Sequence, residues 1–244
     1  MQLSTFVRTA SMALVATVLT ACTASSQDST THSPTLPGDD HTITITFVRH
    51  GESAGNASGL IDTSTPGPDL TDLGRQQARA AADTYAGQGI DGVFASTMVR
   101  TQQTAEYISQ SVHKPVRVLA GLREIEAGQY EHQPEATAQR TYFQAPIAWL
   151  DGRRYMRIPG SIDGDEFDRR FDDAIQQIYD SGDRRPIAVA HGGSIMIWTL
   201  MNVKNPQDDL LKTHPLGNTG HISVTGNPRD GWELLDWDGV AVPH

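Results

Sequence analysis

An arginine and a histidine stand side by side in Arg49-His50-Gly51-Glu52-Ser53, directly behind the alternating β-branched run Ile43-Thr44-Ile45-Thr46. That run predicts a strand, and Gly51 allows the backbone to turn sharply at its end. A guanidinium offers a planar fork of donors suited to phosphate oxygens. A neutral imidazole beside it can act as a nucleophile or a base. The pair therefore indicates chemistry on a phosphate group.

Two later segments repeat this layout of apolar strand, polar residue and following helix. In the first, Ala95-Ser96-Thr97 leads to Arg100, and in the second, Ala190 leads to His191-Gly192-Gly193. Because the carboxyl ends of parallel strands lie along one edge of a sheet, we expect His191 to meet His50 although 141 positions separate them. Helix N-termini at that edge add free N–H groups and a positive dipole end, both suited to phosphate.

These motifs carry a resemblance to a known family. The run Arg49 to Ser53, followed by Asn56, resembles the signature of the histidine phosphatase superfamily, also called the phosphoglycerate mutase-like family. The resemblance implies that His50 is the nucleophile and becomes a transient phosphohistidine. It also implies that Arg49, Asn56 and Arg100 bind the phosphate oxygens, and that His191 stabilises the transition state.

The leaving alkoxide needs a proton. The segment Leu122-Arg123-Glu124-Ile125-Glu126-Ala127-Gly128 resembles the family's Leu-x-Glu-x-x-x-Gly element, which implies that Glu124 is the proton donor. A carboxyl group beside a phosphate dianion should have a raised pKa and so hold its proton until it is needed. Glu126 is the rival for this role.

The resemblance covers about residues 43–225, with departures that favour one branch. His191 is followed by Gly192 and not by Asp, unlike the acid phosphatase branch, whose second motif is His-Asp. The chain also lacks the length of a phosphoglycerate mutase with its extra insertions. Both points favour the compact phosphatase branch.

The remaining pattern predicts an α/β fold. Strands are expected at 43–48, 92–95, 116–118, 186–190, 222–224 and 232–235, and helices at 70–85, 97–112, 136–150, 164–179 and 195–203. The apolar residues at helical spacing, which mark the core face of the first helix, include Leu73, Ala78 and Tyr85. Thr71 is the expected N-cap of the first helix, and Ser96 or Thr97 that of the second. The alternation predicts βαβ units and a mainly parallel sheet, here in a three-layer α/β/α arrangement.

Composition narrows the class of protein. The 244 residues are 38% hydrophobic and 20% charged, as in a soluble globular protein. A formal net charge of −10 excludes a general nucleic-acid binder, which needs a basic footprint. An anionic substrate must therefore find a local positive pocket within an overall repulsive field.

The first 40 residues have the pattern of a targeting segment followed by a linker. Thr9 to Ala21 is an apolar run too short to span a bilayer, which predicts a signal peptide over 1–21. Leu19-Thr20-Ala21-Cys22 resembles a bacterial lipobox, which implies an actinobacterial-type lipoprotein anchored by lipid on Cys22, the only cysteine. The alternative is an incidental thiol in a plain secretory signal. Residues 22–40 form a Ser/Thr/Pro-rich tether, and 41–244 the catalytic domain.

We therefore expect a phosphomonoesterase on the extracytoplasmic face of a membrane, or secreted, that needs neither metal nor cofactor. One alternative is mutase-type phosphoryl transfer, and another is a non-catalytic surface lipoprotein that binds phosphorylated ligands. Substrate choice is expected from the 57–69 loop and the 130–165 region. Arg153, Arg154 and Arg157 fit either a second anionic group of the substrate or a solvated loop.

Overall fold

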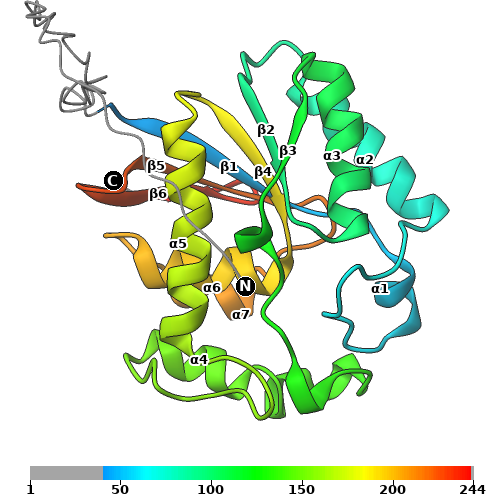
Figure 1. The fold of residues 1–244 in the computed structure, drawn as a ribbon, viewed down its shortest axis with the longest axis vertical. Helices are drawn as coiled ribbons and strands as arrows, with labels where there is room; N and C mark the ends of the chain where they lie inside the picture. The colour runs from blue at the N-terminus through cyan, green and yellow to red at the C-terminus, as the bar shows by residue number, and fades with distance from the viewer. Residues whose placement is uncertain (1–40, 243–244) are drawn as a thin grey trace, which may run out of the picture. The chain divides into compact units, whose positions relative to one another are not determined.

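A computed structural model of the protein describes residues 41–242. The predicted signal peptide, lipobox, Cys22 and tether lie outside the described residues. Within them, one sheet has the strand order β3-β2-β4-β1-β5-β6-β7 (Figure 1). The strands β3, β2, β4 and β1 are mutually parallel, and β5, β6 and β7 join antiparallel beyond β1. The predicted α/β fold with its mainly parallel sheet is confirmed.

Six of the seven strands in the described residues lie close to where the sequence predicts them, and β7 was not predicted. The strands are β1 (Ile43–Arg49), β2 (Gly92–Ala95), β3 (Val116–Val118), β4 (Pro186–Ala190), β5 (His221–Asn227), β6 (Gly231–Trp237) and β7 (Val240–Ala241). The helices are α1 (Ala54–Ser58), α2 (Asp72–Tyr85), α3 (Val99–Val112), α4 (Gln144–Leu150), α5 (Gly164–Asp180), α6 (Gly192–Asn202) and α7 (Leu210–Thr213). Three 3₁₀ helices lie between β3 and α4: η1 (Ala120–Leu122), η2 (Gly128–Tyr130) and η3 (Glu135–Arg140).

The helices cover both faces of the sheet because successive strand residues point to opposite sides. In β1, Val48 belongs to the smaller apolar core that includes Ala82 of α2 and Ile108 of α3. Its neighbour Phe47 belongs to the larger core with Phe171 of α5 and residues of α6. The parallel strands are thus buried on both faces, as is usual for βαβ units.

The register of the parallel strands decides where the reactive residues meet. Arg49 is paired with Ala190, and Ala95 with Val189, so β1, β2 and β4 end almost level. The backbone N–H of His50 donates to Ala190 O over 3.1 Å, and that of Ser96 to Val189 O over 3.2 Å. His50, Ser96 and His191 therefore leave the sheet at one edge, as predicted.

Three local predictions are wrong. The N-cap of α3 is Met98, whose side chain makes no capping hydrogen bond. The hydroxyl of Ser96 contacts His191. Residues 136–150 do not form one helix but the 3₁₀ helix η3 followed by α4, with Thr141 in a non-helical conformation between them. Leu73, expected on the core face of α2, is 48% exposed.

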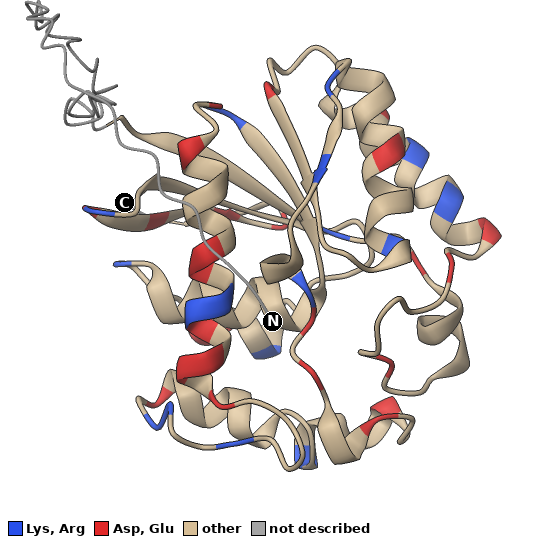
Figure 2. Ribbon diagram, viewed as in Figure 1, with Lys and Arg blue, Asp and Glu red and all other residues tan. Residues whose placement is uncertain are grey.

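Charge is dispersed over the surface of this domain. Figure 2 shows acidic and basic segments interspersed along α5, with no continuous basic face in this view. Among residues 41–242, no helix is both long enough and apolar enough to cross a bilayer.

Candidate active site

A pocket of about 220 Å³ opens at the carboxyl edge of the parallel strands. Five of the six side chains predicted to act in the active site line it: Arg49, His50, Asn56, Arg100 and Glu124. The sixth, His191, is fully buried beside them, with its ring centroid 5.2 Å from that of His50. The sheet therefore brings together all six residues from five separate segments of the chain.

The ring of His50 is held as one neutral tautomer. Its Nδ1 lies 2.7 Å from Gly51 O, and a carbonyl only accepts, so Nδ1 carries the proton. The other nitrogen, Nε2, accepts a hydrogen bond from Arg100 Nε over 3.0 Å. Nε2 thus keeps its lone pair, which is the state that a nucleophile needs.

Burial and charge both keep this imidazole unprotonated. The pKa of His50 lies well below its ordinary value, first because burial disfavours the charged ring and then because Arg100 and Arg49 are positive neighbours. The hydrogen bond to Gly51 opposes this shift. The net direction of the shift leaves the ring of His50 neutral at physiological pH.

Arg49 and Arg100 each bind a backbone carbonyl and also have a buried nitrogen with no hydrogen-bond partner among the described residues. Arg49 donates from Nη1 to Leu216 O over 2.7 Å, and Arg100 donates from Nη2 to Asp62 O over 3.0 Å. Within residues 41–242, Arg49 Nε and Arg100 Nη1 are buried and have no hydrogen-bond partner. Leaving a buried donor without a hydrogen bond costs free energy, so these two N–H groups are suited to donate to an anionic ligand.

His191 is fixed from behind by a residue for which the sequence suggested only a capping role. Its Nε2 lies 2.8 Å from Ser96 Oγ, while its Nδ1 is buried and unpaired among the described residues. If the Ser96 hydroxyl donates to Nε2, the proton of the neutral ring resides on Nδ1. Burial, followed by the charge of Arg100, lowers the pKa of His191 well below its ordinary value. His191 can then offer one N–H to an anionic oxygen.

Asn56 is held on its oxygen side. Its Oδ1 accepts from Ser53 N over 3.2 Å and from Asn218 Nδ2 over 3.3 Å. The amide NH₂ is therefore the group of Asn56 left for a ligand. Asn218 also donates to His50 O over 3.1 Å, which ties the end of β1 to Asn56. No sequence motif predicted Asn218 as a site residue. Its place between Gly217 and Gly220 indicates only a loop.

The structure separates the two glutamates that competed for the role of acid. Glu124 lines the pocket, and its carboxylate accepts from Gly193 N over 3.0 Å and Ser194 N over 2.7 Å at the N-terminus of α6. Burial raises its pKa, against the opposing effect of those backbone hydrogen bonds. Glu126 instead pairs with Arg170 over 2.7 Å and with Arg123 over 3.2 Å, away from the pocket lining.

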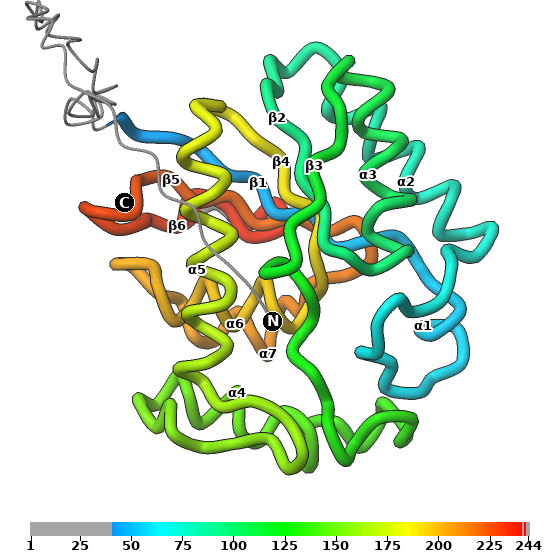
Figure 3. The backbone as a smooth tube through the Cα atoms, in the orientation of Figure 1, coloured from blue at the N-terminus to red at the C-terminus, as the bar shows by residue number. Residues whose placement is uncertain are grey.

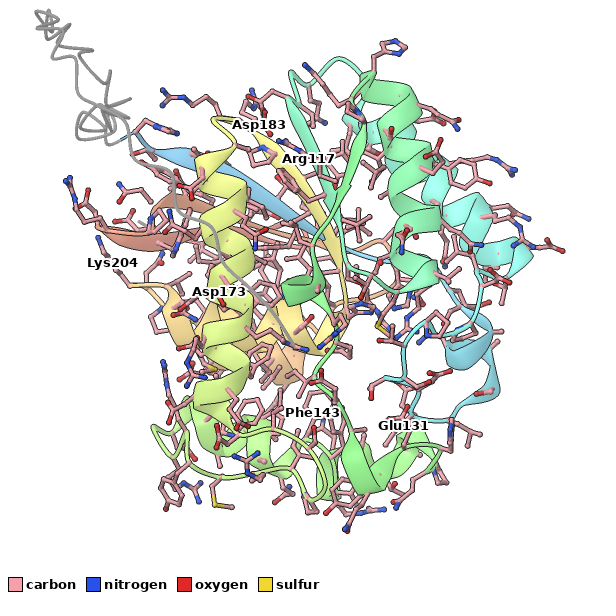
Figure 4. The ribbon with its side chains drawn as sticks, viewed as in Figure 1. Arg117, Glu131, Phe143, Asp173, Asp183 and Lys204 are labelled. Atoms are coloured by element: carbon pink, nitrogen blue, oxygen red, sulfur yellow. The ribbon has the colours of Figure 1, made fainter. Side chains whose placement is uncertain are left out.

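Two regions expected to select the substrate form one wall. Leu60 pairs with Pro134, and Ile61 N donates to Gln133 O over 2.8 Å. The Glu131 carboxylate clamps Thr63 by accepting from its hydroxyl over 2.6 Å. Figure 3 shows the α1 segment and the segment before α4 at the same end of the domain. Glu131 and Phe143 lie at this end, far from Arg117 and Asp183 (Figure 4).

The arginines at 153, 154 and 157 do not reach the pocket. They pair with Asp151, Asp168 and Asp163 respectively, and none lines the pocket. The structure therefore does not support the interpretation in which these arginines bind a second anionic group of the substrate. Among residues 41–242, no three His, Cys, Asp or Glu side chains gather in a way that could hold a metal ion.

Comparison with known proteins decides the family. Residues 45–239 match the histidine phosphatase superfamily, branch 1. The chain belongs to this superfamily. The structure is similar to that of a mycobacterial glucosyl-3-phosphoglycerate phosphatase, with a TM-score of 0.67 and 22% identity over 82% of this chain and all of that one. The chain therefore has the fold of this solved protein.

Curated relatives of the chain carry several names. A PE-PGRS family protein, PE_PGRS11 of Mycobacterium tuberculosis, is 44% identical over 84% of this chain, which spans only 38% of that protein. A glucosyl-3-phosphoglycerate phosphatase of Mycolicibacterium vanbaalenii is 29% identical over 81% of this chain and 95% of that one. A probable phosphoglycerate mutase of Yersinia pestis is 30% identical over 62% of this chain and 70% of that one.

Proposed function

We propose that the protein is a phosphomonoesterase that works through a phosphohistidine on His50. One observation carries the proposal: beside the ring of His50, whose Nε2 is unprotonated, three side chains each have a buried nitrogen with no hydrogen-bond partner among the described residues, namely Arg49 Nε, Arg100 Nη1 and His191 Nδ1. Together they form what we call the phosphate cradle. Phosphoryl transfer needs little beyond positioning and neutralisation of charge on the equatorial oxygens.

The proposed reaction has two steps. In the first, His50 Nε2 attacks phosphorus, the bond from phosphorus to the ester oxygen breaks, and Glu124 gives its proton to the leaving oxygen. In the second, a water molecule gives a proton to Glu124 and attacks phosphorus, the N–P bond breaks, and inorganic phosphate leaves. The raised pKa of Glu124 suits a group that must hold a proton before the first step. Positive charge comes from Arg49 and Arg100, so the proposal includes no metal and no cofactor.

The test compares phosphate release by wild type and His50→Ala on a panel of phosphomonoesters. Wild type should release phosphate from at least one ester, and His50→Ala should lose at least about a thousandfold in rate. Wild type quenched during turnover should carry phosphate on His50 that is stable to base and labile to acid. Equal rates for the two proteins would exclude the catalytic role of His50.

A mutase is the second candidate, favoured by the relative named as a probable phosphoglycerate mutase. A mutase returns the phosphoryl group from histidine to an isomer of the substrate, whereas a phosphatase passes it to water. Steady phosphate release without a diphosphorylated activator supports the phosphatase. The third candidate, a lipoprotein that only binds phosphorylated ligands, predicts tight binding with no release by wild type.

We also propose that the enzyme is exported and anchored outside the cytoplasm through lipid on Cys22. The support is the apolar run from Thr9 to Ala21 followed by Leu19-Thr20-Ala21-Cys22. Residues 22–40 would then be the tether and 41–244 the enzyme domain. Wild type should fractionate with membranes in a bacterial host that processes lipoproteins, and Cys22→Ala should not. Identical fractionation of the two proteins would contradict the anchor.

A further inference from the structure

The pocket contains two cations among the described residues that line it, and both belong to the phosphate cradle. The remaining lining is apolar, acidic or polar without a positive charge. Resting on the proposed phosphatase function, we infer that the substrate is a phosphomonoester whose alcohol portion carries no second negative charge and presents an apolar part to the pocket.

The charges of the cradle are matched by the phosphoryl group alone. Arg49 and Arg100 each have one unpaired buried nitrogen, and a phosphate dianion supplies the acceptors and the charge for both. A carboxylate elsewhere on the substrate would instead face Asp62 and Glu135, which also line the pocket. Like charges in a partly enclosed site repel more strongly than in water.

Other cations near the pocket are committed elsewhere or lie outside the lining. Arg170 donates to Glu126 over 2.7 Å and to the backbone carbonyls of Arg123 and Glu124. Arg140 and Lys212 adjoin lining residues in sequence, but both are exposed and neither lines the pocket. Among residues 41–242, Arg49 and Arg100 are therefore the only arginines or lysines that line the pocket, so no further cation there is available to pair with a second anion.

The apolar part of the lining comes from four segments of the chain. Leu60 follows α1, Phe143 precedes α4, and Met196 belongs to α6; Leu211, Pro215 and Leu216 complete this apolar wall. The hydroxyl of Tyr142 donates a hydrogen bond to Ile125 O over 2.5 Å, so the ring is the part of this side chain that can contact a ligand. Leu60 is 39% exposed, and an exposed apolar side chain at a pocket is a usual sign of ligand contact.

Two matched pairs of esters test the inference with the purified protein. Glycerol 3-phosphate and 3-phosphoglycerate differ by a hydroxymethyl group against a carboxylate. The other pair, 4-methylphenyl phosphate and 4-carboxyphenyl phosphate, differs by a methyl group against a carboxylate. Wild type should show a kcat/KM at least tenfold higher for the uncharged member of each pair, and the ratio should shrink as salt is added.

Substitutions in the outer pocket, by which we mean the lining residues outside the phosphate cradle, locate the effect. Glu135→Lys should raise kcat/KM for the carboxylated esters severalfold more than for the uncharged ones, which share the phosphate but lack the carboxylate, and Glu135→Gln should do the same more weakly. Phe143→Ala should lower kcat/KM for 4-methylphenyl phosphate about fivefold or more, with glycerol 3-phosphate little affected.

The outcomes separate the two proposals. Equal or better turnover of the carboxylated esters by wild type would overturn the inference about the substrate and leave the phosphatase function standing. An equal effect of Glu135→Lys on both members of a pair would overturn the assignment of the outer pocket. No phosphate release from any of the four esters would count against the phosphatase function and the inference together.

Discussion

Arg100 Nε donates a hydrogen bond to His50 Nε2 over 3.0 Å, so a cation lies directly against the lone pair of the proposed nucleophile. This contact holds the imidazole in place and lowers its pKa. It must be exchanged when phosphorus approaches Nε2, since one lone pair cannot accept a hydrogen bond and form the new bond together. Arg100 can then turn this donor to the phosphoryl oxygens.

Arg100→Lys tests whether the shape of the guanidinium matters beyond its charge. A lysine keeps the charge but cannot reach His50, Asp62 O and the phosphoryl group together. We expect kcat/KM for phosphate release to fall about 10²- to 10³-fold with the fold intact by circular dichroism. The matched control is Arg79→Lys on the exposed surface of α2, which should behave as wild type. Comparable losses in both variants would remove the special role of Arg100.

Glu124→Gln tests the proton donor through the leaving group. An alkyl phosphate needs a proton on its departing oxygen, whereas 4-nitrophenolate leaves without one. We expect kcat/KM for the alkyl ester to fall about 10²- to 10⁴-fold, and that for 4-nitrophenyl phosphate by less than about tenfold. Glu126→Gln is the matched control, because Glu126 pairs with Arg170 and Arg123 outside the pocket. A leaving-group dependence in Glu126→Gln instead would reverse the assignment.

Ser96→Ala tests whether Ser96 positions His191. The hydroxyl lies 2.8 Å from His191 Nε2 and, as a donor there, keeps the ring proton on Nδ1 for the phosphoryl group. Its loss should lower kcat/KM about tenfold to a hundredfold, mainly through kcat. Ser96→Thr, which restores the hydroxyl, should recover most of the activity. If Ser96→Ala raises KM alone, or if Ser96→Thr is no better, the positioning role is wrong.

The two buried histidines should make stability depend on pH. Their folded pKa values are lowered, so below about pH 6.5 the unfolded chain binds protons that the folded chain does not. Stability is therefore full above that pH and falls as the pH drops toward the folded values, by up to about 1.4 kcal/mol per pH unit for each histidine. The raised pKa of Glu124 works in the opposite direction.

Urea unfolding at pH 7.5 and at pH 5.5 measures this effect. Wild type should lose free energy of unfolding between the two conditions, and His191→Gln should lose less because one of the two groups is gone. Glu124 is present in both proteins, so its contribution cancels in the comparison. A loss in His191→Gln as large as that in wild type would show that His191 is not held neutral in the folded state.

The sequence by itself determined most of the elements and which residues are candidates for the chemistry. Alternating and continuous apolar runs decide β1, β2 and β4, because buried strands need them on one or both faces. Arg49 and His50 follow the first of these runs, and His191 follows the last, so their place at a strand end could be read locally. Over residues 136–150 the prediction of one helix was wrong: Thr141 is not helical, and the hydroxyl of Tyr142 after it donates to Ile125 O, a partner in another segment that local periodicity does not indicate.

Only the tertiary structure decided which groups are committed and which remain unpaired. Glu124 and Glu126 stand two positions apart in one irregular loop, yet one meets the N-terminus of α6 and the other meets Arg170. Ser96 and Asn218 act through partners 95 and 162 positions away, a pairing that no local pattern encodes. The charge of the outer pocket likewise depends on where Glu135 and the arginines at 153, 154 and 157 lie in space, because a charge acts through distance and burial.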